Sequence, residues 1–335
     1  MSTAQSSYLG RGALRQLGEV LREASPRSVF LVKSPDAYEA SGAQPLVEEA
    51  LAGLETRSFD SFTPNPKWPD IMAAMEFFRR SPCDLILAVG GGSAIDIGKL
   101  VGLLSLQPAA PESYLKEGVE PSGPVIPLVA IPTTAGSGSE ATRFAVAYYE
   151  GKKYSIAHEK ILPSWCLVDP ALTDNLPSLW SASSGLDAFC QAVESMWAVQ
   201  SDDESTACSR KAIALSFDQL AVASSTSPTQ ASRDAMCEAS HLAGKAINIS
   251  KTTACHALSY TMTFNILLTR AMCHNTFTSL LRTQSAHSME CASSFECSNF
   301  LEIFALEKQP RARQHIERGA GEHRRAVRAR RQTFN

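Results

Sequence analysis

The sequence predicts an α/β fold in which a Rossmann-like parallel sheet is followed by an all-helical region. Short apolar runs alternate with helical patterns through the first half of the chain. Continuous apolar strands that alternate with helices are typical of a parallel sheet covered on both faces. From about Trp180 onward only helical patterns follow, and these predict the second region.

Four apolar runs are the predicted strands of the first region. They span residues 28–33, 84–89, 125–131 and 144–149, and a helix is predicted near 37–54. Three stretches of the second region have helical patterns. They span residues 181–199, 203–223 and 231–248. Ser183 or Ser184 is expected near the start of the first of these helices, because serine is a favoured N-cap.

We place the first domain at residues 1–178 and a partial helical domain at 179–266. Residues 267–335 have no clean period and are rich in Ser, Thr and Cys before an Arg-rich end. We interpret 267–335 as an atypical, out-of-frame or disordered tail. On that interpretation the helical domain is truncated.

Composition excludes several classes of protein. The chain has 335 residues, of which 44% are hydrophobic and 19% charged, with a net charge of -3. These values exclude disorder over most of the chain, and no apolar run approaches the roughly 18–20 residues of a spanning helix. The N-terminal residues lack the apolar segment of a secretory signal. Nine cysteines without CxxC spacing favour a reduced interior, so we expect a cytoplasmic protein without membrane contact.

Charge is unevenly distributed along the chain. Residues 307–335 hold nine basic and three acidic side chains, so this tail is +6 and the remaining chain is -9. A basic tail suits nucleic acid, but this one lacks interleaved aromatic residues. We expect a solvated or disordered end and no nucleic-acid partner.

The segment Gly90-Gly91-Gly92-Ser93 follows a predicted strand and opens a predicted helix. Glycines let backbone N–H groups approach an anion, and a helix N-terminus adds partial positive charge. Phosphate binding is the functional interpretation, and tight packing is the alternative. Asp96, in the following helix, is expected to cap it or to contact ribose or substrate. The pattern is not a P-loop, because Lys99 lies too far along the helix.

A second polar loop follows the strand at 125–131 and contains Thr133, Thr134 and Ser137. Ligands in parallel sheets bind beyond the carboxyl ends of the strands. Two such loops at neighbouring strand ends therefore favour a nucleotide crevice over simple turns.

Polar side chains with catalytic potential recur in the helical region. Asp187 and Gln191 are four residues apart and share a helix face, and Glu194 is three residues further on. Lys245 and Lys251 precede His256 and suit an anionic substrate. Each also has a structural alternative. The carboxylates are then solvated acids, His256 is a hydrogen-bonded core histidine, and the two lysines are surface residues.

Six segments carry a resemblance to a known family. They are YLGRGALRQLGEVL (8–21), GGGSAIDIGK (90–99), IPTTAGSGSE (131–140), DPALTDNLP (169–177), SGLDAFCQAVES (184–195) and CHAL (255–258). In this order they resemble the iron-containing alcohol dehydrogenase superfamily over about residues 8–265. The resemblance implies a dinucleotide-binding α/β domain, a helical domain and an active site between them.

The resemblance also implies cofactor contacts. Gly90, Gly91, Gly92 and Ser93 are expected to hold the pyrophosphate, and Thr133, Thr134 and Ser137 to line the ribose and nicotinamide. Lys153 matches a cofactor-contacting lysine. Many members carry an Asp after the first strand that repels a 2′-phosphate, whereas this chain has Lys33 and Ser34 there. We therefore favour NADPH over NADH.

The family's metal is held by an Asp and three His residues. Asp187 and His256 match two of these ligands, but Gln191 replaces the second and Arg270 stands at the fourth position. The resemblance thus implies a weakly held divalent metal, Fe or Zn, or none. Without a metal, Lys245 or Lys251 would stabilise the oxyanion. Tyr260 replaces a catalytic His of the family and is the expected acid, with Lys251 and Asp96 as further catalytic candidates.

Within the superfamily, the segments around Asp187 and His256 resemble the phosphonoacetaldehyde reductase branch. The resemblance implies NAD(P)H-dependent reduction of a small anionic aldehyde such as phosphonoacetaldehyde. Arg143, Lys245 and Lys251 would then clamp the phosphonate. Alternatives are another activity of the superfamily, such as a glycerol dehydrogenase or a dehydroquinate synthase-like lyase, and an inactive nucleotide-binding remnant. A homo-oligomer is compatible with the resemblance.

After Ile266 the chain departs from the family's expected Ser-His-Gly segment. One set of codons for residues 268–270, read one base later, encodes Ser-His-Gly. We therefore hypothesise that the sequence is out of frame from about residue 267. Sequencing genomic DNA and transcript across this region tests the hypothesis, because an uninterrupted present frame in both would reject it.

Overall fold

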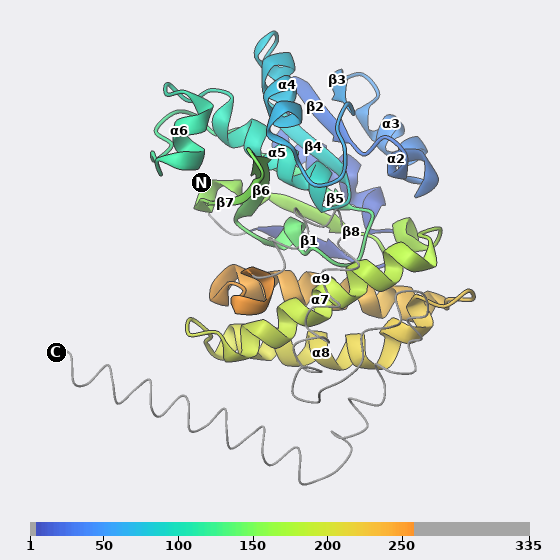
Figure 1. Ribbon diagram of the computed structural model, residues 1–335. Coiled ribbons are helices and arrows are strands. Elements are labelled where there is room, and N and C mark those ends of the chain that lie inside the picture. The colour runs from blue at the N-terminus through green and yellow to red at the C-terminus, as the bar shows by residue number, and fades with distance from the viewer. Residues whose placement is uncertain (1–4, 258–335) are drawn as a thin grey trace, which may run out of the picture. The chain divides into compact units, whose positions relative to one another are not determined.

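The computed structural model describes residues 5–257, and its α/β part contains a six-stranded sheet (Figure 1). The strand order is β1-β8-β5-β4-β2-β3, and every pairing in the sheet is parallel. The strands are β1 (Ser6–Leu9), β2 (Ser28–Lys33), β3 (Glu55–Phe59), β4 (Leu85–Gly90), β5 (Leu128–Pro132) and β8 (Trp165–Val168). The predicted Rossmann-like sheet is confirmed.

Helices cover both faces of this sheet. Val29 and Leu31 of β2 pack with the helices α1, α2 and α3, whereas Phe30 and Val32 pack with α4 and α5 on the other face. The helices of this part are α1 (Leu17–Ala24), α2 (Ala37–Ala40), α3 (Ala43–Leu51), α4 (Trp68–Arg79), α5 (Gly92–Leu104) and α6 (Pro111–Lys116). Burial on both faces explains why the central strands are continuous apolar runs.

Two predictions for this part are wrong in detail. The run 144–149 forms β6 (Phe144–Tyr149), which pairs antiparallel with β7 (Lys152–Ala157) in a separate hairpin instead of extending the parallel sheet. The helix predicted near 37–54 is two helices, because the chain turns at Gly42 with φ +79°. Only a short turn separates β6 from β7, and parallel pairing needs a longer crossover.

Three long helices form the second part, as predicted. They are α7 (Ser178–Trp197), α8 (Asp203–Ala223) and α9 (Gln230–Ser250). The predicted start at Ser183 or Ser184 is wrong, since α7 begins at Ser178 after Pro177. Proline fixes its own φ and lacks an N–H, so it ends the preceding segment and lets the helix begin there. Asp202 and Thr229 each close a capping box at the starts of α8 and α9.

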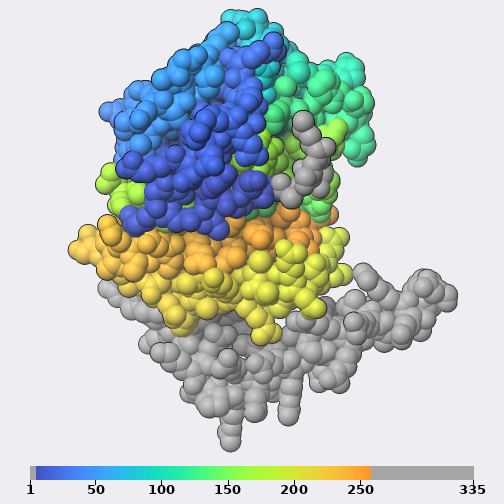
Figure 2. Space-filling view, turned by 180° about the vertical axis from the view of Figure 1, so that it is seen from behind, coloured from blue at the N-terminus to red at the C-terminus, as the bar shows by residue number. Residues whose placement is uncertain are grey.

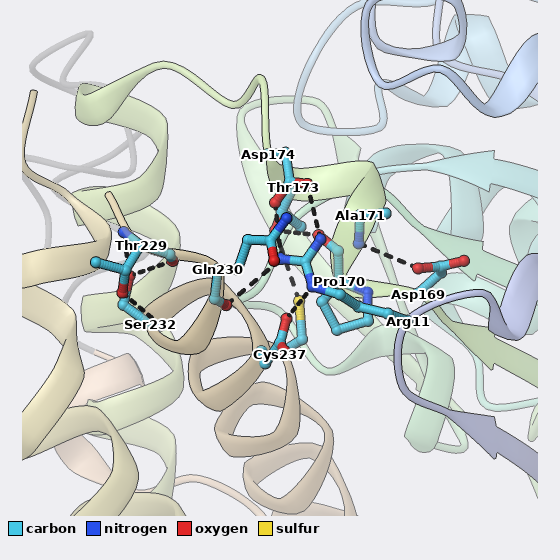
Figure 3. A network of polar contacts seen from close by, with 11 residues as sticks. Arg11, Asp169, Pro170, Ala171, Thr173, Asp174, Thr229, Gln230, Ser232 and Cys237 are labelled. Atoms are coloured by element: carbon cyan, nitrogen blue, oxygen red, sulfur yellow. Dashed lines mark hydrogen bonds and ion pairs between the residues drawn. The ribbon is translucent and has the colours of Figure 1, made fainter. Parts of the chain in front are cut away.

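The α/β part and the helices are in direct contact. Figure 2 shows α9, in gold to orange, against the blue N-terminal elements, with α8, in yellow, on the far side of α9. Arg11, after β1, makes two hydrogen bonds of 2.8 and 3.0 Å to Asp174, and its Nε lies 2.7 Å from Asp234 on α9 (Figure 3). Asp169 accepts a hydrogen bond of 3.1 Å from the backbone N–H of Leu14. These contacts tie the start of the chain to the helical part.

Among the described residues, no helix is both long enough and apolar enough to span a bilayer. Helix α7 begins at Ser178, and the domain boundary at residue 178 stays a prediction. The boundary at 266, the tail at 267–335 and Tyr260 lie outside the described residues.

Candidate functional site

The glycine loop joins β4 to α5 as the sequence predicts. Gly90 ends β4 with φ +154°, and a Cβ there would lie 2.0 Å from Oγ of Ser34. Only glycine is tolerated at this point, because Ser34, at the end of β2, fills the space. Gly91 is the N-cap of α5 and makes no side-chain cap, so the first N–H groups of the helix carry no capping side chain. This is the arrangement that suits a phosphate.

The second predicted loop lies beside the first. The N–H of Thr133 donates to the carbonyl of Gly90 at 3.0 Å, and a Cβ on Gly91 would lie 3.5 Å from Thr134. The hydroxyl of Thr133 is buried without a hydrogen-bond partner among residues 5–257. A buried hydroxyl without a partner is costly, so it indicates a polar ligand at this edge. Ser93 is engaged already, since its Oγ accepts from the N–H of Asn65 at 3.0 Å.

Asp96 and Lys99 of α5 form a buried network below these loops. Asp96 accepts from Oγ of Ser139 at 2.6 Å and from the N–H of Val146 at 3.2 Å. Lys99 is fully buried and donates to the carbonyls of Ser139, Thr142 and Phe144 at 2.6–2.7 Å. Burial lowers the pKa of Lys99 to about 8, although the charges of Asp96 and Glu140 oppose this. The network fixes the backbone that follows the second loop, and a substrate role for Asp96 stays a prediction.

Helix α7 brings the predicted metal ligands to the second loop. The side-chain amide of Gln191 donates to the carbonyl of Ser137 at 3.3 Å. A Cβ on Gly136 would lie 2.4 Å from the carbonyl oxygen of Ser184, so the loop packs directly on α7. The structure therefore joins two candidate groups that are more than fifty residues apart in the sequence.

His256 lies between two carboxylates. Its Nδ1 is 2.6 Å from Oε1 of Glu194, and its Nε2 is 3.3 Å from Oδ1 of Asp187. Burial lowers the pKa of His256, but the hydrogen bonds and charges of the two acids outweigh it and raise the pKa to about 9. Burial likewise opposes ionisation of Glu194, yet hydrogen bonds from His256 and Thr253 lower its pKa.

The geometry assigns separate tasks to the two ring nitrogens. Glu194 accepts the Nδ1 proton. Because the pKa of His256 is raised to about 9, Nε2 also carries a proton at neutral pH and donates it to Oδ1 of Asp187 at 3.3 Å. A divalent metal held by Nε2 and Oδ1 would take the place of that proton. A carboxylate that orients a histidine in this way is typical of metal-ligating histidines.

The donor set fits a divalent metal. Two donors bound at about 2.1 Å to one tetrahedral ion would lie about 3.4 Å apart, close to the separation of Nε2 and Oδ1. Within residues 5–257 no group of three or more His, Cys, Asp and Glu side chains is placed to hold a metal. Oε1 of Gln191, one turn from Asp187, is the third candidate donor, because it is buried without a hydrogen-bond partner in the described part of the chain.

The basic side chains predicted to bind the substrate and the cofactor lie on several elements. Lys245 and Lys251 are exposed, on α9 and at its end. Arg143 forms an ion pair with Glu159, and its backbone N–H donates to Asn248 at 2.8 Å. Lys153 lies on β7, paired in register with Tyr148.

Sequence reasoning gave Glu194 no role in the site. It follows Asp187 by seven residues, which places both on one face of α7. That spacing was the available signal. His241 and Glu140 were also missed, and they form a buried contact at 3.3 Å between α9 and the second loop.

Two models of known protein families match this chain. A family model described as iron-containing alcohol dehydrogenase matches residues 4–170. A second, described as the C-terminal part of the Fe-containing alcohol dehydrogenase family, matches residues 181–305, beyond the motif-based resemblance.

Three individual proteins illustrate the likeness. Alcohol dehydrogenase 4 of Saccharomyces cerevisiae is 32% identical over 260 residues, which cover 76% of this chain and 67% of the relative. The NAD-dependent methanol dehydrogenase of Bacillus methanolicus is 29% identical over 259 residues, covering 76% and 68%. A sulfoacetaldehyde reductase from Bifidobacterium kashiwanohense, solved with NAD⁺, superposes with a TM-score of 0.77 at 28% identity. That superposition covers 85% of this chain and 76% of the reductase.

The two family models together span more than half of the chain, and they follow its α/β and helical parts in order. The chain belongs to the iron-containing alcohol dehydrogenase family.

Proposed function

We propose that this protein reduces a small anionic aldehyde with NAD(P)H, and that phosphonoacetaldehyde is its substrate. The observation that carries the proposal is the link from Gln191 to the carbonyl of Ser137 at 3.3 Å. Because Gln191 is one turn from Asp187 on α7, this link supports a site that joins the cluster of Asp187, Glu194 and His256 to the loop predicted to bind the nucleotide. A carbonyl-polarising group and a hydride donor must meet in this way for aldehyde reduction.

In this proposal the loop Gly90–Ser93 holds the pyrophosphate, and Thr133, Thr134 and Ser137 line the ribose and nicotinamide. The buried hydroxyl of Thr133, which lacks a protein partner among residues 5–257, supports a polar ligand there. Lys153 is assigned to the cofactor as well. Hydride passes from C4 of the nicotinamide to the carbonyl carbon, and the carbonyl oxygen takes up one proton.

Asp187, His256 and Oε1 of Gln191 would hold a divalent metal, Fe or Zn. When bound, such a metal supplies a Lewis acid for the carbonyl oxygen. Glu194 fixes the imidazole orientation by accepting from Nδ1, with a hydrogen bond of 2.6 Å. Tyr260, outside the described residues, is assigned as the proton donor.

The anionic substrate is the finer part of the proposal. The sulfoacetaldehyde reductase that superposes on this chain is named for an aldehyde that carries an anionic group. Lys245 and Lys251 are assigned to the phosphonate, because their ammonium groups are exposed near the end of α9. Arg143 is assigned a supporting role, since Glu159 already holds its guanidinium.

A substrate panel tests the proposal. Phosphonoacetaldehyde, sulfoacetaldehyde and propionaldehyde are compared by cofactor oxidation, each with NADH and NADPH and with added Fe²⁺ or Zn²⁺. We expect kcat/KM for phosphonoacetaldehyde to exceed that for propionaldehyde by at least about tenfold, the usual gain from one charge-assisted contact. Equal values would reject the anionic substrate, and cofactor binding without any turnover would reject the enzyme.

A matched pair of variants locates the anion site. Lys251→Met should lower kcat/KM for the anionic aldehydes and leave propionaldehyde unchanged. Lys211→Met is the control, because Lys211 is exposed on α8 and pairs with Glu238. A loss that is equal for charged and uncharged aldehydes would show that Lys251 does not bind the anionic group.

A further inference from the structure

The chain order of the sheet defines one switch point. From β2 the chain moves outward to β3, and it then returns to place β4 on the other side of β2. The helices after β2 cover one face and the helix after β4 covers the other. The crevice of such a sheet lies outside the carboxyl ends of the two strands at this switch, here β2 and β4.

Lys33 is the last residue of β2 and stands at that crevice, paired in register with Val89. Its ammonium group lies 3.8 Å from Oδ2 of Asp60 and 5.0 Å from the ring centre of Tyr38. Asp60 follows β3, the neighbouring edge strand. The charge at the end of β2 is thus held by an acid from the next strand.

The position of Asp60 is fixed by its own turn. The N–H of Phe62 donates to the carbonyl of Asp60 at 3.0 Å, and the rings of Phe59 and Phe62 stack at 6.4 Å. The side chains of Lys33 and Asp60 keep 26% and 50% of their exposure. A pair this exposed is screened by water and is readily opened by a competing anion.

The chemistry of dinucleotide sites indicates a role for the pair of Lys33 and Asp60. A carboxylate at the end of the strand beside the glycine loop accepts the ribose 2′-hydroxyl and repels a 2′-phosphate, whereas a cation there attracts the phosphate. This chain has both groups, the cation on β2 and the acid on β3. We infer that Asp60 determines cofactor specificity: by pairing with Lys33 it weakens the attraction for a 2′-phosphate, so the site accepts both NADH and NADPH.

This inference rests on the proposed function only in placing a dinucleotide at the crevice. Binding of NADPH requires Lys33 to exchange Asp60 for the 2′-phosphate, with the acid still close to that phosphate. Without the Asp60 carboxylate, Lys33 binds the 2′-phosphate with no competing acid beside it. NADH lacks the phosphate, so its affinity depends little on Asp60.

Equilibrium binding to the full chain tests the inference without requiring turnover. Dissociation constants for NADH and NADPH are measured by nucleotide fluorescence for the unaltered protein, Asp60→Asn and Asp60→Asn with Lys33→Ala. The control is Asp84→Asn. Asp84 pairs with Arg27 at 3.3 Å just before β4 and β2 begin, so this pair lies at the other end of the strands from Lys33 and Asp60. Asp60→Asn and Asp84→Asn change the net charge equally.

We expect Asp60→Asn to lower the dissociation constant of NADPH about three- to fivefold and that of NADH less than about twofold, with the gain lost when Lys33 is also removed. Asp84→Asn should alter the ratio of the two constants less than about twofold. Equal effects of Asp60→Asn on both nucleotides, or none, would overturn the inference, as would unaltered protein that binds neither. If nucleotides bind with the expected ratio but no aldehyde is reduced, only the proposed function fails.

Discussion

The two parts of this protein are packed from different side chains. The α/β part has a core of large aliphatic and aromatic residues, with Phe30, Phe78 and Ile86 fully buried. One buried apolar cluster among α7, α8 and α9 consists of four alanines, with Ile213 and Leu242 packed against it, while Leu220 and Met236 meet Gly185 nearby. Buried serines accompany these alanines at the helix contacts. Small side chains let the helices approach closely, but each contributes little apolar area.

This difference in packing implies that the α/β part supplies rigidity through apolar burial, whereas the helical part carries the candidate metal ligands. Burial of large apolar side chains on both faces stabilises the sheet, so its strand ends form a rigid edge. The helical part depends more on individual polar contacts, such as the 2.7 Å bond between the hydroxyls of Ser250 and Ser195. The candidate ligands Asp187, Gln191 and His256 all lie in this second part, where buried polar groups are already common.

Lys99 is one exception that tests this division, because it is a charged group that is fully buried in the α/β part. Lys99→Met would leave three carbonyls without their donor. We expect the free energy of unfolding to fall by about 3 kcal/mol, the usual cost of several buried acceptors left unpaired. Urea unfolding measures the change, with Lys211→Met as an exposed control. A loss below about 1 kcal/mol would mean that packing alone fixes this segment.

Substitutions in the candidate site should have the next largest effect, which is on kcat/KM. His256→Ala leaves Asp187 and Glu194 buried without the imidazole, so kcat/KM should fall at least about 100-fold, or about 2.7 kcal/mol. Glu194→Gln keeps the shape but weakens control of the Nδ1 proton, and its loss should be about 10- to 100-fold. His158→Ala is the control, since His158 caps a short turn elsewhere. Retained turnover in His256→Ala would remove this cluster from the site.

The contact between the two parts depends on a pair of glycines. A Cβ on Gly244 of α9 would lie 2.6 Å from the carbonyl oxygen of Gly138. Gly244→Ala should therefore destabilise the protein by about 1–3 kcal/mol through overpacking. Gly18→Ala is the matched control: a Cβ on Gly18 in α1 meets nothing within 4 Å, so alanine there should stabilise by about 0.5–1 kcal/mol. Thermal unfolding of both variants should show opposite signs.

The smallest expected effect lies at the start of α8. Hydrogen bonds from the backbone of Ser205 lower the pKa of Asp202, the N-cap of this helix. A lowered pKa in the folded state adds stability above the unfolded value of 3.8, and this is lost as pH falls through the folded value. Asp202→Asn keeps a capping oxygen but cannot titrate. Acid unfolding curves of the two proteins should therefore converge at low pH, and an unchanged curve would contradict the account.

The sequence predicts the central elements better than the edges. The runs 28–33 and 84–89 are recognisable because both faces of these strands are buried. The edge strands β1 and β3 were not predicted, since most of their residues are exposed or half-buried and lack an apolar run. The buried strand β8, between β1 and β5, was also not predicted, because it is only four residues long. Physical periodicity therefore identifies strands that are both well buried and long enough to form an apolar run.

The site was predictable only in part for a similar reason. Asp187 and Gln191 share a helix face, which the spacing predicts. The contact of Glu194 with His256 joins residues 62 apart in sequence. It depends on the turn at Lys251, whose φ is +64° after α9 ends. The spacing places Glu194 on the face of Asp187, but no local pattern specifies how the chain returns from the turn at Lys251, so its contact with His256 is seen only in the folded structure.

The most direct test of the account is hydride transfer itself. The full chain is incubated with phosphonoacetaldehyde and NADH or NADPH deuterated at C4 of the nicotinamide, in turn on each face, and the alcohol product is analysed by mass spectrometry. The account predicts one deuterium on the hydroxyl-bearing carbon of the product with one labelled face, and its loss in His256→Ala. A product without deuterium from either label, or no product although the cofactor binds, would contradict the assignment of this site as a reductase.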